Sequence, residues 1–423
     1  MKQHSQQASP ATCMDDFDPN SMIVDEAVRH IREAVSNVLE TEQTPIRDAL
    51  DRVLAQTVTS PINVPAYTNS AMDGYAIRAA DWNGNEYKRF KISGTVMAGA
   101  PLAGDTQVNE CVRIMTGGKM PAGTDTVVMQ EHVTLDNDHI VVNRDIQPGQ
   151  NVRQAGEDIK HGARVLEIGK RLTASDIGLL ASLGIENVNV YRQVRVAFFS
   201  TGDELVSLGG QLKEGQIYDS NRYTLFAMLR RFGASIIDLG VIRDNRQDLE
   251  RAFHTAAQKA DVLITTGGVS VGEADFVKEI LEKLGRVNFW KIAMKPGRPL
   301  AFGKLDDCIF FGLPGNPVST MVTFYVLVLP ALRKIQGETE TPMMTLKMPC
   351  VSPLRKAAGR IEYQRGIMEQ NESGDWLVRS VGGQGSHILS SMSKANCFII
   401  LPLECANLEP DTMVTVLPFA GLI

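Results

Sequence analysis

Short apolar runs alternate with helical stretches between residues 194 and 335, and this alternation constrains the fold of the chain more than any other feature. Apolar runs lie at Val194–Phe199, Ser235–Val241, Val262–Thr266 and Cys308–Phe311. Apolar residues recur at helical spacing over Tyr223–Phe232, Gln247–Ala260, Ala274–Leu284 and Val318–Ile335. Strands that alternate with helices of this length are typical of βαβ units. The pattern predicts a doubly wound parallel-sheet α/β domain over residues 191–337.

The N-terminal region has a different texture. Residues 1–20 are polar and aperiodic, which predicts a disordered arm. Apolar residues from Ile23 to Leu39 follow helical spacing, and Arg47–Ala55 has a second, shorter helical pattern. Residues 61–158 then carry short apolar runs separated by Gly, Pro, Asn and Asp, which predicts an inserted β domain.

Helical signals return after this insertion. Thr173 is a potential N-cap with Asp176 three residues later, and Gly184 is a potential C-terminal glycine. A β insertion between helical segments predicts a discontinuous helical or mixed linker domain made of residues 21–60 plus 159–190. The turn-rich tail, residues 338–423, predicts a C-terminal β-barrel-like domain with strands at Leu346–Val351, Ile361–Met368, Leu377–Val381, Cys397–Leu401 and Met413–Leu417. The fold class is therefore α/β multidomain.

Charge and composition exclude several classes of function. Lys plus Arg is 43 against 49 Asp plus Glu, a net charge of -6, so no global positive field attracts nucleic acid. No apolar run approaches the roughly 20 residues that span a bilayer, and the first eight residues are polar, so we expect a cytoplasmic protein without a membrane segment. Neither HExxH nor CxxC occurs, so a metal should have oxygen ligands.

The loops that follow the four predicted strands carry the candidate ligand residues. In an open parallel sheet, ligands bind beyond the carboxyl ends of the strands. The loops lack GK[ST] and GxGxxG, which disfavours nucleoside triphosphates and dinucleotides, but their glycines and hydroxyls suit another phosphate-bearing ligand. Ordinary turns and N-caps explain each loop alone; four together favour a site. The candidates are Ser200, Thr201, Gly202, Asp203, Thr266, Gly267, Gly268, Ser270, Gly272, Pro314, Asn316 and Pro317.

Charged residues at the same loops indicate how an anion could be held. Glu204, Asp244 and Asp275 would repel a phosphate unless a divalent ion such as Mg²⁺ bridged them. Lys291, Lys295 and Arg298 lie between the third and fourth loops, where neighbouring prolines stiffen the backbone. Fixed cations suit a dianion, and solvated surface charges are the alternative interpretation.

Further candidates lie outside the α/β region. The insertion contains Asp73 next to Gly74, Thr116 in a Thr-Gly-Gly turn, and Asp158. The tail contains Arg365 and Ser386, each beside glycine. Hairpin and β turns are the alternative interpretation of all these segments.

Six motifs in order resemble the molybdopterin molybdotransferase family, the molybdenum-insertion enzymes of molybdenum cofactor biosynthesis. The motifs are SAMDGYA (70–76), RIMTGG (113–118), STGDEL (200–205), TGGVSVGEAD (266–275), MKPGRP (294–299) and GLPGNPVS (312–319). The resemblance runs from Ile23 to the C-terminus. It implies a four-domain, elongated homodimer that binds adenylyl-molybdopterin, takes molybdate as co-substrate, inserts it into the dithiolene and releases AMP. Other cofactor-biosynthesis proteins are expected as partners.

The resemblance also implies roles for individual residues. Glu204, Asp244 and Asp275 fall on the Mg²⁺ and pyrophosphate region, and Asp73, Thr116 and Asp158 would come from the partner subunit. Lys291, Pro314 and Pro317 shape the cleft. One departure is Arg298, where several relatives have lysine; a planar guanidinium donates hydrogen bonds in a different geometry. The residues implied for the molybdate pocket are Lys295, Arg298, Pro299, Ser319, Arg365 and Ser386.

Two alternative functions remain. A molybdopterin adenylyltransferase uses a similar α/β domain but would not need the insertion or the tail. A non-catalytic dimeric scaffold of the same fold is the second, because a relative of this fold anchors membrane receptors in animals. That role usually accompanies extra domains and long linkers. It would also give no function to the predicted acidic and cationic site residues. A transferase is therefore the favoured interpretation.

Overall fold

A computed structural model describes residues 20–419 except 83–86, 143, 268–278, 282 and 284. The chain forms two compact units, each described by itself. The first consists of Met1–Glu42, Asp51–Ala55 and Val190–Ile423, and the second of Gln43–Leu50 and Gln56–Asn189. The predicted disordered arm lies outside the described residues, apart from Asn20. The finer predicted division into domains stays a prediction.

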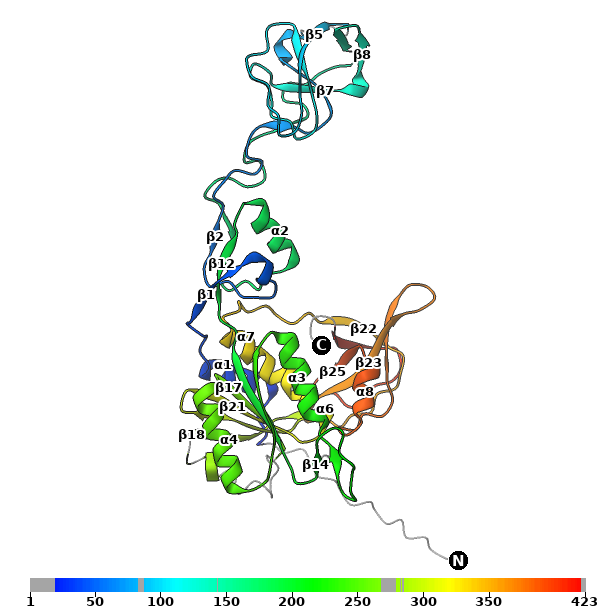
Figure 1. Ribbon diagram of the computed structural model, residues 1–423. Coiled ribbons are helices and arrows are strands. Elements are labelled where there is room, and N and C mark those ends of the chain that lie inside the picture. Colours follow the sequence, from blue (N-terminus) through cyan, green and yellow to red (C-terminus); the bar gives the residue numbers. More distant parts are fainter. Residues whose placement is uncertain are drawn as a thin grey trace, which may run out of the picture. The chain divides into compact units, whose positions relative to one another are not determined.

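A six-stranded sheet in the order β16-β13-β17-β21-β20-β18 forms the centre of the first unit (Figure 1). Four strands are parallel, as predicted: β13 (Arg195–Thr201), β16 (Ser235–Ile242), β17 (Val262–Thr266) and β21 (Cys308–Leu313). The remaining two, β18 (Gly285–Lys291) and β20 (Pro299–Leu305), form an antiparallel hairpin at one edge. This hairpin was not expected from the sequence, because β18 mixes polar and apolar residues and is largely exposed.

Helices cover both faces of this sheet, which confirms the doubly wound architecture. Alternate residues of β13 point to opposite faces, so Phe198 packs in one core and Phe199 in another. The first core contains α1 (Val24–Ala34), α3 (Ser220–Phe232), α6 (Pro317–Thr323) and α7 (Leu329–Ile335). The second contains α4 (Arg246–Lys259). The predicted helix Ala274–Leu284 lies mostly outside the described residues.

A π-helical segment, η4 (Phe324–Val328), joins α6 to α7 into one helix from Pro317 to Ile335. Its 19 residues and mean hydropathy of 1.4 are enough to cross a bilayer by length and composition. This corrects the expectation that no apolar stretch approaches that length. However, 83% of the apolar window is buried inside the fold, where Leu327 and Val328 pack against the sheet. This helix is therefore part of the hydrophobic core of the first unit.

The C-terminal strands close into a barrel. The order β23-β24-β22-β26-β25 returns to β23, which also pairs with β25. These strands confirm the predicted β-barrel-like region, and α8 (Leu389–Lys394) precedes the last two of them. A short strand of the cation-rich segment, β19 (Met294–Lys295), pairs in parallel with β23. The barrel strands are β22 (Leu346–Cys350), β23 (Ile361–Gln370), β24 (Trp376–Ser380), β25 (Cys397–Leu401) and β26 (Thr412–Pro418).

The second unit contains the predicted β structure. Its six-stranded sheet has the order β7-β4-β6-β5-β9-β8, and Phe90, Cys111 and Ile140 lie in its core. The strands are β4 (Gly74–Ile77), β5 (Arg89–Val96), β6 (Glu110–Ile114), β7 (Thr126–Met129), β8 (Val133–Asp136) and β9 (His139–Val142). Short pairs join β2 (Val58–Thr59) to β11 (Arg164–Leu166), and β3 (Asn69–Ser70) to β10 (Val152–Arg153).

Two helical predictions have different outcomes. The helix α2 (Ala174–Ser182) begins as predicted, because the backbone N–H and the hydroxyl of Thr173 donate to the Asp176 carboxylate at 2.9 and 2.8 Å. The helix predicted over residues 47–55 is wrong, since only one 3₁₀ turn forms at Ile46–Asp48. Asp51 adopts a positive φ of 62°, which a right-handed helix does not accommodate.

Candidate functional site

Three of the four predicted loops meet at the carboxyl ends of the parallel strands. Ser200 and Thr266 are in register on β13 and β17, and the Thr266 hydroxyl donates to the Ser200 hydroxyl at 3.1 Å. A Cβ built on Gly267 would lie 2.4 Å from the Thr201 carbonyl oxygen, and one on Gly315 would lie 3.8 Å from the Gly267 Cα. The loops after β13, β17 and β21 therefore form one polar surface.

The start of α3 adds two residues that the sequence analysis missed. Asn221 donates to the Gly315 carbonyl at 2.6 Å, and Asp219 accepts from the Arg222 N–H at 3.1 Å. Three buried atoms, Thr201 Oγ1, Asp219 Oδ2 and Asn221 Oδ1, have no hydrogen-bond partner among the described residues. Buried polar atoms without partners are costly unless a ligand or water satisfies them. In the sequence, Asp219 is indistinguishable from an ordinary N-cap, a role that it also fills.

The predicted metal ligands are only partly described. Glu204 is exposed and its carboxylate lies over Gly202, where an added Cβ would be 2.6 Å from Oε2. Asp244 follows β16, whose Ile242 is in register with Thr201. Mg²⁺ prefers one or two carboxylates plus phosphate oxygens, so these acids fit that ion. Among the described residues no three His, Cys, Asp or Glu side chains converge on one point. Gly268, Ser270, Gly272 and Asp275 lie outside them.

The remaining predicted ligand residues of this edge lie where their strands end. Asp203 is exposed beside Gly202. Pro314 is buried after β21, and its carbonyl accepts from the Thr320 hydroxyl at 2.7 Å. Asn316 and Pro317 occupy the N-cap and the first position of α6. The segment therefore leads directly from the strand-end loops into the core helix.

A second group of predicted residues surrounds β23, and backbone contacts link its members in a ring. Lys295 pairs with Glu362 of β23, and Arg365 of the same strand donates to the Gly385 carbonyl at 3.0 Å. The neighbouring Ser386 accepts at its carbonyl from the Val318 N–H at 3.0 Å. Ser319 follows, and its carbonyl would lie 3.5 Å from a Cβ on Gly297. Most residues that the resemblance implied for molybdate therefore lie around one place.

Three other predicted residues belong to the hairpin beside this ring. Lys291 of β18 is exposed and lies directly opposite Pro299, the first residue of β20. The carbonyl of Arg298 accepts from the Ile292 N–H at 2.7 Å, so the turn that carries Arg298 folds back on β18. These contacts fix the backbone on both sides of Lys295.

Arg365 is fully buried, and burial lowers its pKa to about 10. Its Nε donates to the Ser391 hydroxyl at 3.0 Å, and its Nη2 donates to the Gly385 carbonyl. These oxygens are neutral. A buried guanidinium held by neutral acceptors keeps its positive charge available to an anion.

The structure places two more charged residues beside this ring that the sequence analysis missed. Glu362 is 5% exposed at its side chain and lies 3.4 Å from the Lys295 Nζ. Lys356 is buried and donates to the Cys405 carbonyl at 2.8 Å; burial lowers its pKa. The sequence marks Glu362 only as one of two polar residues, with Gln364, in a predicted strand, and this does not assign it a role.

The candidates in the second unit form one tight contact. Both the backbone N–H and the hydroxyl of Thr116 donate to the Asp73 carboxylate at 2.7 Å, and these hydrogen bonds lower the pKa of Asp73. Asp158 is exposed, and its N–H donates to the Val64 carbonyl at 3.0 Å. No described contact links Asp158 to Asp73.

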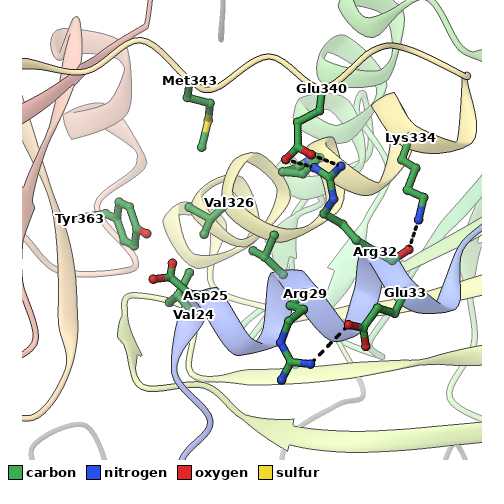
Figure 2. A pocket seen from close by; sticks show the side chains of 12 residues that line it. Val24, Asp25, Arg29, Arg32, Glu33, Val326, Lys334, Glu340, Met343 and Tyr363 are labelled. Carbon is green, nitrogen blue, oxygen red and sulfur yellow. Dashed lines mark hydrogen bonds and ion pairs between the residues drawn. The ribbon is translucent and has the colours of Figure 1, made fainter. Parts of the chain in front are cut away.

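A cavity of about 590 Å³ lies elsewhere in the first unit, between α1, the helix of α7 and Tyr363. Figure 2 shows two ion pairs at this cavity, Arg32 with Glu340 and Arg29 with Glu33. The Lys334 ammonium donates to the Arg32 carbonyl. None of the predicted site residues lines this cavity. The strand-end loops and the ring around β23 remain the candidate functional site.

Three family profiles match the chain in order. The MoeA N-terminal region (domain I and II) matches residues 22–184, a probable molybdopterin binding domain matches residues 197–334, and the MoeA C-terminal region (domain IV) matches residues 347–419. The second profile covers the sheet with its strand-end loops, and the third covers the barrel that contains Arg365 and Ser386.

Individual relatives extend the similarity over nearly the whole chain. A molybdopterin molybdenumtransferase of Haemophilus influenzae is 47% identical over 408 residues, covering 95% of this chain and all of that protein. Gephyrin of Dictyostelium discoideum is 35% identical, and the match covers 93% of this chain but 62% of gephyrin. The crystal structure of a molybdopterin biosynthesis MoeA protein from Pyrococcus horikoshii has a TM-score of 0.83 at 27% identity, covering 94% of this chain and all of that one.

Proposed function

The chain belongs to the MoeA family of molybdopterin molybdenumtransferases, and from that membership we propose that it inserts molybdate into adenylyl-molybdopterin and releases AMP. The observation that carries the proposal is the junction of two sites. The segment from Gly315 to Ser319 contacts the strand-end loops at one end and the ring around β23 at the other. One site suits a phosphate-bearing ligand and the other a tetrahedral dianion.

The strand-end loops bind the phosphates and the attached organic groups. Gly267 has a positive φ and lies close to the Thr201 carbonyl. In this conformation, backbone N–H groups of the loop can donate hydrogen bonds to the phosphates of the ligand. The unpartnered oxygens of Asp219 and Asn221 accept hydrogen bonds from N–H or O–H groups of that ligand. Glu204, Asp244 and Asp275 would hold Mg²⁺, which supplies positive charge beside the leaving phosphate when it is bound.

The ring around β23 binds molybdate. Lys295 and Arg365 supply charge, and the Ser319 and Ser386 hydroxyls supply neutral donors. Arg298 and Pro299 border the same pocket. Molybdate held there lies next to the strand-end ligand, because Ser319 follows Gly315 by four residues. Proximity of the two reactants lowers the entropic part of the barrier.

The phosphoanhydride bond breaks as an oxygen of water or of molybdate attaches to the adenylyl phosphorus, and the phosphate of molybdopterin is the leaving group. Attack by water gives AMP directly. Attack by molybdate gives an adenylyl–molybdate anhydride, which releases AMP when its Mo–O bond breaks as the dithiolene sulfurs bind molybdenum. Phosphoryl transfer of this kind needs positioning and charge more than a covalent nucleophile. We assign Asp73, Thr116 and Asp158 to the site of the partner subunit of a homodimer. A cytoplasmic location and other cofactor-biosynthesis proteins as partners belong to the same proposal.

The decisive experiment incubates the purified chain with adenylyl-molybdopterin, molybdate and Mg²⁺ while AMP is measured. We expect AMP release that requires both molybdate and Mg²⁺. Lys304→Ala, which alters an exposed lysine paired with Asp307, is the matched control and should keep wild-type activity. Formation of adenylyl-molybdopterin from molybdopterin and ATP would instead identify an adenylyltransferase. Absence of both reactions would favour the scaffold.

A further inference from the structure

We propose that Glu362 competes with the bound oxyanion for Lys295 and thereby sets the affinity of the pocket for dianions. The proposal rests on the molybdate pocket proposed above and deepens it. Nothing in the sequence resemblance assigned a role to Glu362. Its position beside Lys295 carries the argument.

The backbone places the two side chains opposite each other. Lys295 on β19 and Glu362 on β23 are partners in the register of two parallel strands. The Lys295 Nζ lies 3.4 Å from the Glu362 Oε1, within ion-pair distance. A strand register is discrete, so this pairing does not drift with small movements of the loop.

The carboxylate is buried and anchored by a hydrogen bond, whereas the ammonium is partly exposed. Glu362 Oε2 accepts from the Gln364 amide at 3.0 Å, and that amide also donates to the Arg355 carbonyl at 3.0 Å. The side chain of Glu362 is 5% exposed and that of Lys295 is 35% exposed. An entering anion therefore draws the flexible lysine toward itself and away from a fixed carboxylate.

Glu362 also lowers the positive potential of the whole pocket. Burial lowers the pKa of Lys356 and of Arg365, and the charge of Glu362 opposes this shift in both. Hydrogen bonds hold these two cations on neutral oxygens, with Lys356 on the Cys405 carbonyl and Arg365 on Ser391. Glu362 is therefore a negative charge shared by Lys295, Lys356 and Arg365.

A fixed negative charge acts on an anion in proportion to the charge of that anion. Molybdate carries two charges and perrhenate, a tetrahedral oxyanion of similar size, carries one. Removing the Glu362 charge should therefore strengthen molybdate binding by about twice the free energy that it gains for perrhenate. A positioning role without competition would instead weaken both anions.

The test measures the binding of molybdate and of perrhenate to the full chain by titration calorimetry at low salt. Glu362→Gln keeps the shape of the side chain and removes its charge. For this variant we expect molybdate to bind roughly tenfold more tightly and perrhenate roughly threefold, the ratio that a charge effect requires. Glu369→Gln is the control, because Glu369 lies on the same strand in an ion pair with Arg379 at 2.8 Å. It should leave both affinities unchanged.

Circular dichroism establishes that each variant is folded. If Glu362→Gln does not fold, Glu362→Asp keeps the charge but retracts it from Lys295, and molybdate should then bind roughly threefold more tightly. Unchanged or weaker molybdate binding in a folded variant would overturn the competition, as would an equal gain for both anions. Failure of the unsubstituted chain to bind molybdate or to release AMP would instead refute the proposed function.

Discussion

Gly267 lies against the carbonyl of Thr201, so closely that an added Cβ would be 2.4 Å from the oxygen. This contact joins the loop after β17 to the loop after β13. Gly267 also has a φ of 86°, a conformation that other residues adopt at a cost. The strand-end surface therefore depends on the absence of a side chain at this position.

Gly267→Ala should displace the loop after β17 and reduce AMP release roughly tenfold or more, since small misplacements near reacting groups have effects of that order. The matched control is Gly233→Ala. Gly233 has a φ of 89° at the end of α3, and an added Cβ meets no atom within 4 Å. That variant should lose about 1 kcal/mol of stability from backbone strain and keep its activity. Equal activity in the two variants would contradict the close contact.

The pair of Arg192 and Asp261 predicts a pH dependence of stability. Arg192 donates to both Asp261 oxygens at 2.7 and 2.8 Å. Burial raises the pKa of Asp261, but hydrogen bonds from Arg192 and Arg195 outweigh it and hold the pKa below the usual 3.8. Because the folded-state pKa is lowered, the stabilisation is complete above the unfolded-state pKa and disappears as the pH falls through the folded-state value.

Asp261→Asn should lower the free energy of unfolding at pH 7 by about 2 kcal/mol, because this ion pair is partly exposed and hydrogen bonds to charged groups contribute about 1.5 to 3 kcal/mol. The difference from the wild type should shrink as the pH falls below about 4. Chemical denaturation at several pH values measures both effects. Asp307→Asn, at an exposed pair with Lys304, should change nothing measurable. A difference that stays constant down to pH 2 would contradict the assigned cause.

Lys295→Ala should raise the molybdate concentration for half-maximal activity by roughly tenfold or more, since a charge-assisted contact contributes about 1.5 to 3 kcal/mol. Binding of adenylyl-molybdopterin should change much less. Tungstate should compete with molybdate, and sulfate only weakly. If the variant instead lost affinity for adenylyl-molybdopterin and kept its molybdate dependence, the two sites would have been exchanged.

Asp73→Ala and Glu204→Ala should each be inactive, and mixing them should restore part of the activity. The reason is that subunit exchange would rebuild one intact site per mixed dimer. Native mass spectrometry establishes that exchange has occurred. Mixtures that stay inactive after confirmed exchange would refute a site shared between subunits.

Elements that are buried along their whole length were predictable from the sequence. The apolar runs Val262–Thr266 and Cys397–Leu401 coincide with β17 and β25, which are buried along most or all of their length. By contrast, β18 is largely exposed, has no regular alternation of polar and apolar residues and pairs with its hairpin partner β20, so no local pattern identified it. The helix predicted over residues 47–55 does not form, because Asp51 adopts a left-handed backbone conformation that the spacing of apolar residues does not reveal.

The candidate site likewise contains residues that the sequence predicts and residues that it does not. Lys295, Arg365 and Ser386 were predicted from the sequence, because charged and polar residues close to glycine and proline stand out there. Glu362 and Asp219 did not stand out. The role of Glu362 follows from the register of β19 with β23. That of Asp219 follows from its place at the start of α3 beside Asn221, which donates to the distant Gly315 carbonyl. Neither relationship is local in sequence.

The central claim, insertion of molybdenum coupled to loss of AMP, is tested most directly by the stoichiometry of one reaction. After incubation with adenylyl-molybdopterin, molybdate and Mg²⁺, the molybdenum bound to molybdopterin is measured by elemental mass spectrometry and AMP by chromatography. We predict equal molar amounts of the two products at every time point. AMP release without molybdenum in the product would contradict the account.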